Sequence, residues 1–262
     1  MMNFDFYNPV KILFGEGKIG EISNEIPKDA KVLMTYGGGS IFRNGVYDQV
    51  KSALKGFKVF EFGGIEPNPK YETLMKAVNT TKKEKIDFLL AVGGGSVIDG
   101  TKFIAAAVNF NGDPWKILTE GKVVEISTAI SFGTVLTLPA TGSEMNSGSV
   151  ISRESTQEKY AFGSPLIFPK FSILDPTVTY SLPTNQIANG IVDAFVHVTE
   201  QYLTFPVQAL VQDRWAEGLL QSLIEISPQA TANPHNYDIR ANLMWASTMA
   251  LNGIISVGVP VS

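Results

Sequence analysis

Residues 91–102 constrain the fold most, because three consecutive glycines, residues 93–95, separate an apolar run from a helix-forming segment. The apolar run, residues 86–90, has the length and composition of a buried strand. A strand that enters a helix through glycines exposes backbone N–H groups that bind phosphate without obstruction. Ser96 is placed to donate its hydroxyl or to cap the helix, and Asp99 to complete a capping box. The stretch predicts a diphosphate site; the alternative is an ordinary tight turn.

The same strand–glycine–helix pattern occurs earlier in the chain. Residues 31–36 form an apolar run that ends at a second glycine triplet and Ser40, and an amphipathic helix follows to about Leu54. Residues 58–62 are predicted as a strand and residues 71–85 as a helix. The alternation is regular, and each crossover is long enough for parallel pairing. The sequence therefore predicts an α/β N-terminal domain, doubly wound around a mainly parallel sheet.

The remaining elements follow from shorter patterns. We expect edge strands within residues 4–14, a strand at residues 134–138, a hairpin of residues 149–153 and 160–162, and a strand at residues 171–175. From Thr184 onward the periodicity is helical, in residues 186–203, 207–226 and 238–255, with breaks at Pro206, Pro228 and Pro234. We place a domain boundary near Tyr180. Residues 1–180 are then a dinucleotide-binding α/β domain, and residues 181–262 an all-α domain that carries metal and substrate.

Charge and composition exclude several classes of partner. The 21 basic and 25 acidic residues give a net charge of −4 without a basic block, so no nucleic-acid partner is expected. The N-terminus lacks the pattern of a signal peptide, and no apolar run is long enough to span a membrane, so we expect a cytoplasmic protein without a membrane partner. With no cysteine, a metal must be bound by His, Asp or Glu.

Two glycine triplets that each follow a strand provide two anchor points for one extended ligand, as a dinucleotide requires. Where an NAD-selective site places an acidic residue, this chain has residues 37–40 and then Arg43. Free N–H groups, a hydroxyl and a guanidinium accept a 2′-phosphate, which a carboxylate would repel. We therefore predict NADP(H) rather than NAD(H). The alternative is that residues 37–40 form only a helix-capping turn.

The candidate metal ligands are Asp193 and His197, which stand four residues apart in a predicted helix and so share one face. Alone, such a pair is also compatible with a simple side-chain hydrogen bond. A catalytic metal needs at least three protein ligands, and the other histidine, His235, lies in a polar turn where we expect solvent exposure. Ser143 is interpreted as a helix cap or phosphate contact, because no histidine follows it as a relay.

Taken together, these motifs resemble the iron-containing (group III) alcohol dehydrogenases, and most of all their NADPH-dependent butanol dehydrogenase or aldehyde reductase branch. The matching residues cover the chain from end to end: 7–9, 14–15, 37–41, 44–48, 64–69, 93–99, 102, 138–146, 193 and 197.

The resemblance implies a set of binding residues. Gly37, Gly38 and Ser40 would hold the adenosine ribose phosphate, and Gly94, Gly95 and Ser96 the diphosphate. The cofactor would also be lined by Asn68, Thr137, Thr141, Asn146 and Lys159. Asp193 and His197 would be two of four ligands of Fe²⁺ or Zn²⁺, which polarises the substrate oxygen while hydride passes between NADP(H) and a primary alcohol or aldehyde. A homodimer is the expected assembly.

One departure from the family leaves alternatives open. The family's next helical stretch supplies two histidine ligands, whereas this chain stops at Ser262 after the apolar residues 251–261, so we expect an incomplete helical domain. The leading hypothesis is a metal-dependent, NADP(H)-dependent alcohol dehydrogenase or aldehyde reductase. The alternatives are a non-catalytic cofactor-binding remnant or self-associating module, and a metal-dependent lyase or synthase such as the dehydroquinate synthases. The lack of a dense basic phosphate pocket argues against the last.

Overall fold

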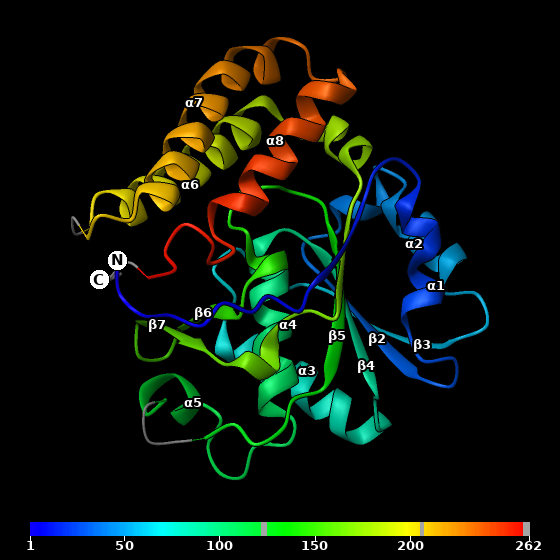
Figure 1. Cartoon of the computed structure of the whole chain (residues 1–262). Helices are drawn as coiled ribbons and strands as arrows, with labels where there is room; N and C mark the ends of the chain where they lie inside the picture. The colour runs from blue at the N-terminus through cyan, green and yellow to red at the C-terminus, as the bar shows by residue number, and fades with distance from the viewer. Residues whose placement is uncertain (122–124, 205–206, 259–262) are drawn as a thin grey trace.

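A six-stranded sheet forms the centre of the N-terminal part of the chain in the computed structural model, which describes residues 1–121, 125–204 and 207–258 (Figure 1). Every strand pairing in this sheet is parallel. The strand order is β1-β8-β5-β4-β2-β3. The strands are β1 (Lys11–Phe14), β2 (Lys31–Tyr36), β3 (Lys58–Phe62), β4 (Phe88–Gly93), β5 (Ser131–Leu136) and β8 (Phe171–Leu174).

Helices cover both faces of this sheet. Helices α3 (Tyr71–Glu84) and α4 (Gly95–Ala107) pack on one face, and α1 (Ile22–Glu25) and α2 (Val46–Ala53) on the other. The two faces are separated by the period-2 alternation of strand side chains. Residues directed toward α3 and α4 include Leu33, Leu89 and Ala91, and residues directed toward α1 and α2 include Val32, Met34, Leu90 and Val92. The predicted doubly wound α/β fold is confirmed.

Several predicted bounds changed in the structure. Residues 31–36 and 58–62 form strands as predicted, but only Lys11–Phe14 of the first segment pairs, at the edge beside β8. Strand β4 begins later than predicted and continues into Gly93, because Gly93 pairs with Leu136 of β5. The predicted hairpin is confirmed as β6 (Gly148–Arg153) and β7 (Glu158–Gly163).

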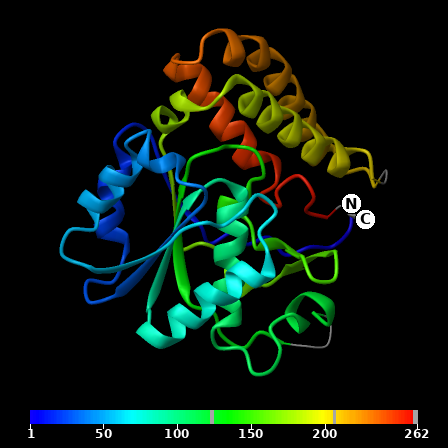
Figure 2. The same cartoon turned by 180° about the vertical axis from the view of Figure 1, so that it is seen from behind.

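The C-terminal part consists of three long helices that pack on each other across one end of the sheet, as both views show (Figures 1 and 2). They are α6 (Thr184–Tyr202), α7 (Leu210–Ala232) and α8 (Tyr237–Ala250). Within the described ranges, no helix is both long and apolar enough to cross a membrane. The domain boundary between residues 180 and 181 stays a prediction, and it falls inside the short helix η5 (Pro176–Ser181).

The predicted break at Pro228 was wrong, because α7 continues through this residue. A proline inside a helix leaves the carbonyl four residues earlier without its N–H donor. Here the Ser227 hydroxyl donates to that carbonyl, the Ile224 oxygen, at 3.2 Å. The side chain replaces the missing backbone donor, so the helix is not interrupted. The predicted break at Pro206 and the end of the apolar segment 251–261 lie outside the described residues.

Candidate functional site

The two predicted phosphate loops leave adjacent strands at the same edge of the sheet. Strands β2 and β4 pair in parallel, with Tyr36 opposite Val92. The strand that follows β2, β3, lies on its far side, and the strand that follows β4, β5, lies on the opposite side of β4. The chain therefore reverses its winding direction between β2 and β4. In open α/β sheets, ligands bind outside the carboxyl ends of the strands at such a topological switch point.

The loop after β4 keeps the N-terminus of α4 free of side chains. Gly94 is the N-cap residue, and no side chain caps the helix with a hydrogen bond. A Cβ atom on Gly95 would lie 2.4 Å from Thr141 Oγ1, and one on Gly94 would lie 3.2 Å from Leu138 Cβ. The turn after β5 thus lies directly against this loop and leaves no room for side chains. An uncapped helix N-terminus of this kind fits the diphosphate of a dinucleotide.

The predicted capping roles of Ser96 and Asp99 were wrong. Helix α4 already begins at Gly95, so Ser96 lies in its first turn and accepts a hydrogen bond from the Asn68 backbone N–H at 3.3 Å. Asp99 is directed away from the helix N-terminus: its Oδ2 accepts from the Val150 backbone N–H at 3.0 Å. Asp99 therefore joins α4 to strand β6.

The loop after β2 is more open than the loop after β4. A Cβ atom on Gly37 would lie 3.2 Å from the Ile65 carbonyl oxygen, whereas nothing lies within 4 Å of one on Gly38. The loop leads into a short 3-10 helix, η2 (Ser40–Phe42), which has no side-chain cap, and α2 begins only at Val46. The Ser40 and Arg43 side chains are exposed. An exposed hydroxyl and guanidinium next to an open loop fit a phosphate monoester.

Three of the predicted cofactor residues, Asn68, Ser96 and Lys159, lie in contact although they come from three separate elements. Asn68, in the loop before α3, donates its backbone N–H to Ser96 and accepts from the Lys159 ammonium on β7 at 2.9 Å. Its φ of 54° lies in the left-handed region, which asparagine tolerates better than most residues. The predicted residue Thr137 is buried directly after β5, where its N–H donates to the Gly93 carbonyl at 3.0 Å.

Sequence reasoning missed a buried polar network centred on Lys102. This side chain is fully buried, and its ammonium donates to Ser143 Oγ at 2.9 Å, to Asn146 Oδ1 at 2.8 Å and to the Gly148 carbonyl at 2.8 Å. The Ser143 hydroxyl in turn donates to Asp99 Oδ1 at 2.5 Å. The expected roles of Ser143 as a cap or phosphate contact were wrong, because both of its partners lie inside the protein. The network fixes Asn146 relative to α4.

Burial is the largest cause of the shifted pKa values in this network. It lowers the pKa of the Lys102 ammonium to about 8, although the charges of Asp99 and Glu144 act in the opposite direction. Burial also raises the pKa values of Asp99 and Glu144. Glu144 Oε1 accepts from the Thr248 hydroxyl of α8 at 2.6 Å, and its Oε2 has no hydrogen-bond partner among the described residues. The turn after β5 is therefore tied to the helical part of the chain.

The predicted metal ligands lie on the helix that packs against this turn. A Cβ atom on Gly190 of α6 would lie 2.5 Å from the Pro139 carbonyl oxygen, so the two backbones are in contact. Asp193 and His197 follow Gly190 by three and seven residues and share its face. His197 Nε2 lies 3.5 Å from Asp193 Oδ2, and the hydrogen bond to Asp193 raises the pKa of His197. The helix that carries the pair therefore meets the turn after β5 at Gly190.

This pair fits a divalent metal in chemistry but supplies only two donors. Carboxylate and imidazole are ligands that iron and zinc both accept. No group of three or more His, Cys, Asp or Glu side chains that could hold a metal occurs within the described part of the chain. His235 lies in the exposed loop between α7 and α8, with its ring 5.4 Å from that of Tyr180. The predicted exposure of His235 is confirmed.

Comparisons with known proteins match the whole length of the chain. A family model described as iron-containing alcohol dehydrogenase matches residues 9–176, and the model of that family's C-terminal part matches residues 187–259. The NADPH-dependent aldehyde reductase YqhD of Escherichia coli is 61% identical over 99% of this chain and 67% of its own length. A probable NADH-dependent butanol dehydrogenase of Bacillus subtilis is 50% identical over 98% of this chain and 67% of its own length.

The solved structures give the same match. The crystal structure of E. coli YqhD superposes with a TM-score of 0.97 at 60% identity, and the match covers 100% of this chain and 67% of that one. The chain thus spans about two thirds of the length of these relatives. The names of the two sequence relatives specify different nicotinamide cofactors, NADPH for the E. coli reductase and NADH for the B. subtilis dehydrogenase.

Proposed function

The chain belongs to the iron-containing alcohol dehydrogenase family, and on this premise we propose that it transfers hydride between NADP(H) and a primary alcohol or aldehyde with the help of Fe²⁺ or Zn²⁺. One observation carries the proposal. Two glycine loops flank the switch point of the sheet, and the turn packed on one of them also touches the helix with Asp193 and His197. The proposed cofactor loops and the helix with the proposed metal ligands therefore lie at the same edge of the sheet.

The matches confirm the coarser predictions. They bear out the suspected family, an enzyme that acts on alcohols and aldehydes, and the use of a nicotinamide cofactor and iron. The assignment gives no support to the alternative of a lyase or synthase. The roles of individual residues, and the choice of NADP(H) over NAD(H), belong to the proposal.

Each part of the cofactor has its own residues in this proposal. Gly94, Gly95 and Ser96 bind the diphosphate through the uncapped N-terminus of α4. The 2′-phosphate is held by Gly37, Gly38 and Ser40, with Arg43 nearby. The cofactor is also lined by Asn68, Thr137, Thr141, Asn146 and Lys159. Asp193 and His197 hold the metal, which supplies Lewis-acid polarisation of the substrate oxygen.

Changing Gly38 to aspartate should shift the preference from NADPH toward NADH. The position has room for a side chain, since nothing lies within 4 Å of a Cβ there, and a carboxylate would repel the 2′-phosphate. We expect the ratio of the NADH to the NADPH dissociation constant to fall by at least about tenfold, which corresponds to about 1.4 kcal/mol. Titration of cofactor fluorescence measures both constants. Gly20→Asp, equally exposed and unobstructed, is the matched control, and an unchanged ratio in Gly38→Asp would remove residues 37–40 from the phosphate site.

Metal-dependent oxidation of NADPH by butyraldehyde, after anaerobic reconstitution with Fe²⁺ or Zn²⁺, tests the activity itself. We expect Asp193→Ala to abolish this turnover but to leave NADPH affinity unchanged, because Asp193 supplies one of the metal donors. Glu200→Ala on the same helix, at an exposed position, serves as the control. Turnover of Asp193→Ala equal to that of the unchanged chain would refute the metal assignment.

A second candidate is a cofactor-binding, self-associating module without turnover. Large exposed apolar side chains favour it, and they gather on α6 and α7: Val192, Val196, Leu210, Val211, Trp215 and Ile224. NADPH binding without metal-dependent turnover, together with an oligomer that grows with concentration on a sizing column, would support this candidate over the first.

The location and assembly are also part of the proposal. We infer a cytoplasmic homodimer that acts on small alcohols and aldehydes and binds neither nucleic acid nor membrane. The net charge of −4 and the absence of cysteine support the location and the partner class, and the exposed apolar face of α6 and α7 supports the dimer.

A further inference from the structure

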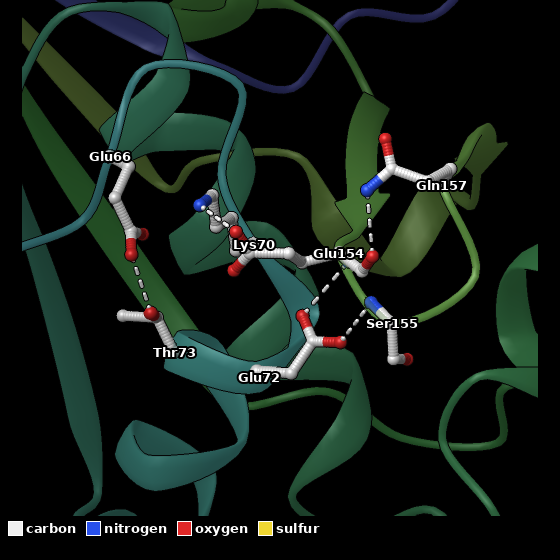
Figure 3. Close-up of polar contacts among 7 residues, drawn as sticks. All are labelled: Glu66, Lys70, Glu72, Thr73, Glu154, Ser155 and Gln157. Carbon is white, nitrogen blue, oxygen red and sulfur yellow. Dashed lines mark hydrogen bonds and ion pairs between the residues drawn. The ribbon is translucent and has the colours of Figure 1, made fainter.

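The β6–β7 hairpin carries Lys159, and the start of α3 holds the turn of this hairpin (Figure 3). The carboxylate of Glu72 accepts two successive backbone N–H groups of the turn: Oε2 accepts from Glu154 at 3.2 Å and Oε1 from Ser155 at 3.1 Å. Both oxygens of one side chain are therefore committed to the backbone of the hairpin. Hydrogen bonds to a charged acceptor are among the stronger ones in proteins.

Three further contacts join the same two segments. The Ser152 N–H donates to the Pro69 carbonyl at 3.0 Å, and the Lys70 ammonium pairs with Glu154 Oε1 at 2.9 Å (Figure 3). The Arg153 guanidinium lies over the Tyr71 ring, 5.2 Å from its centroid. A two-stranded hairpin is only marginally stable by itself. Helix α4 holds the beginning of strand β6 through Asp99 and Lys102, and the contacts with the start of α3 hold the turn at the other end of the hairpin.

The position of Lys159 follows from this attachment. Lys159 on β7 is the register partner of Ser152 on β6, the residue that is bonded to Pro69. Its ammonium then reaches Asn68, which is also bonded to Ser96 in the diphosphate loop. A free lysine side chain loses rotamer entropy when it is ordered. The fixed hairpin reduces the number of positions from which the ammonium can approach the loop.

We propose that Glu72 is a positioning residue for the cofactor: by fixing the turn of the β6–β7 hairpin, its carboxylate holds the Lys159 ammonium beside Asn68 and the diphosphate loop. The inference rests on the proposed contact of Lys159 with NADP(H). Partial burial would raise the pKa of Glu72, but the backbone N–H donors outweigh it and the pKa lies below its usual value. Glu72 therefore remains ionised at neutral pH and keeps both acceptors available.

A double-mutant cycle on the full 262-residue chain, read by NADPH fluorescence titration, tests this role. Lys159→Ala is expected to weaken NADPH binding about tenfold, the effect of losing one charged hydrogen bond, and Glu72→Ala about three- to tenfold. In the Lys159→Ala background, Glu72→Ala should cause no further loss, because its effect acts through Lys159. Glu72→Gln keeps one acceptor oxygen and should restore an intermediate affinity. Glu84→Ala, at the other end of α3, is the matched control and should bind like the unchanged chain.

The possible results separate the inference from the function on which it rests. If Glu72→Ala binds NADPH as the unchanged chain does, or if the two effects multiply in the double variant, Glu72 does not position Lys159. If Lys159→Ala itself retains full affinity, the proposed cofactor contact of Lys159 fails and the inference fails with it. A merely structural role of Glu72 would lower the unfolding midpoint in both backgrounds and would make the binding losses multiply.

Discussion

Replacement of Lys102 by methionine should lower the free energy of unfolding by about 3–5 kcal/mol, the usual cost of removing one partner from a buried charge pair. Methionine keeps most of the side-chain volume but leaves Asp99 without its counter-charge. The change also removes the ammonium group that donates hydrogen bonds to Ser143, Asn146 and Gly148. Urea unfolding followed by circular dichroism measures the effect.

Two comparisons make the Lys102 result interpretable. Lys82→Met on the exposed side of α3 should change stability by less than about 0.5 kcal/mol. The double variant that adds Asp99→Asn to Lys102→Met should lose less stability than the sum of the single changes, because Glu144 is then the one carboxylate of this network left without the Lys102 charge. A loss below about 1 kcal/mol in Lys102→Met would contradict an ionic network in the interior.

Replacement of Gly95 by alanine should weaken NADPH binding by at least about 100-fold, or about 2.7 kcal/mol. The new Cβ would lie 2.4 Å from Thr141 Oγ1 and 2.7 Å from Thr141 Cγ2. Either the N-terminus of α4 or the turn after β5 must then move, and both border the proposed diphosphate site. Fluorescence titration with NADPH measures the loss.

The matched change for Gly95→Ala is Gly20→Ala, outside both glycine loops. Nothing lies within 4 Å of a Cβ at Gly20, and its φ is outside the left-handed region. We expect its affinity to stay within about threefold of the unchanged chain, about 0.6 kcal/mol. If Gly95→Ala also stayed within threefold, the dinucleotide would not bind at the start of α4.

The sheet could be predicted from the sequence because its signals are local. Residues 31–36 and 58–62 are short apolar runs bounded by glycine or lysine, and they are strands at those bounds. The glycine loops were recognisable for the same reason. The error at Pro228 has a different cause, since the rescue of the Ile224 carbonyl by Ser227 depends on one rotamer that no residue pattern specifies.

The buried network was missed because a charged residue on a helix is usually solvated. One signal was nevertheless present: residues 95–107 are apolar on nearly all sides, as is typical of a helix buried all round, so a lysine inside it must find partners in the interior. The contacts of Asn68 with Lys159, and of α6 with Pro139, join residues far apart in the chain. Contacts of this kind could not be predicted from local sequence patterns, because they depend on how the whole chain folds.

A parallel titration of the unchanged 262-residue chain with NADPH and NADH, followed by cofactor fluorescence, is the most direct test of the proposed cofactor site. We expect saturable binding of NADPH at a single site, with NADH binding at least about tenfold more weakly, because residues 37–40 and Arg43 favour a 2′-phosphate. Equal affinity or a preference for NADH would contradict the assignment of the loop after β2. No saturable binding of either cofactor would contradict the proposed dinucleotide site as a whole.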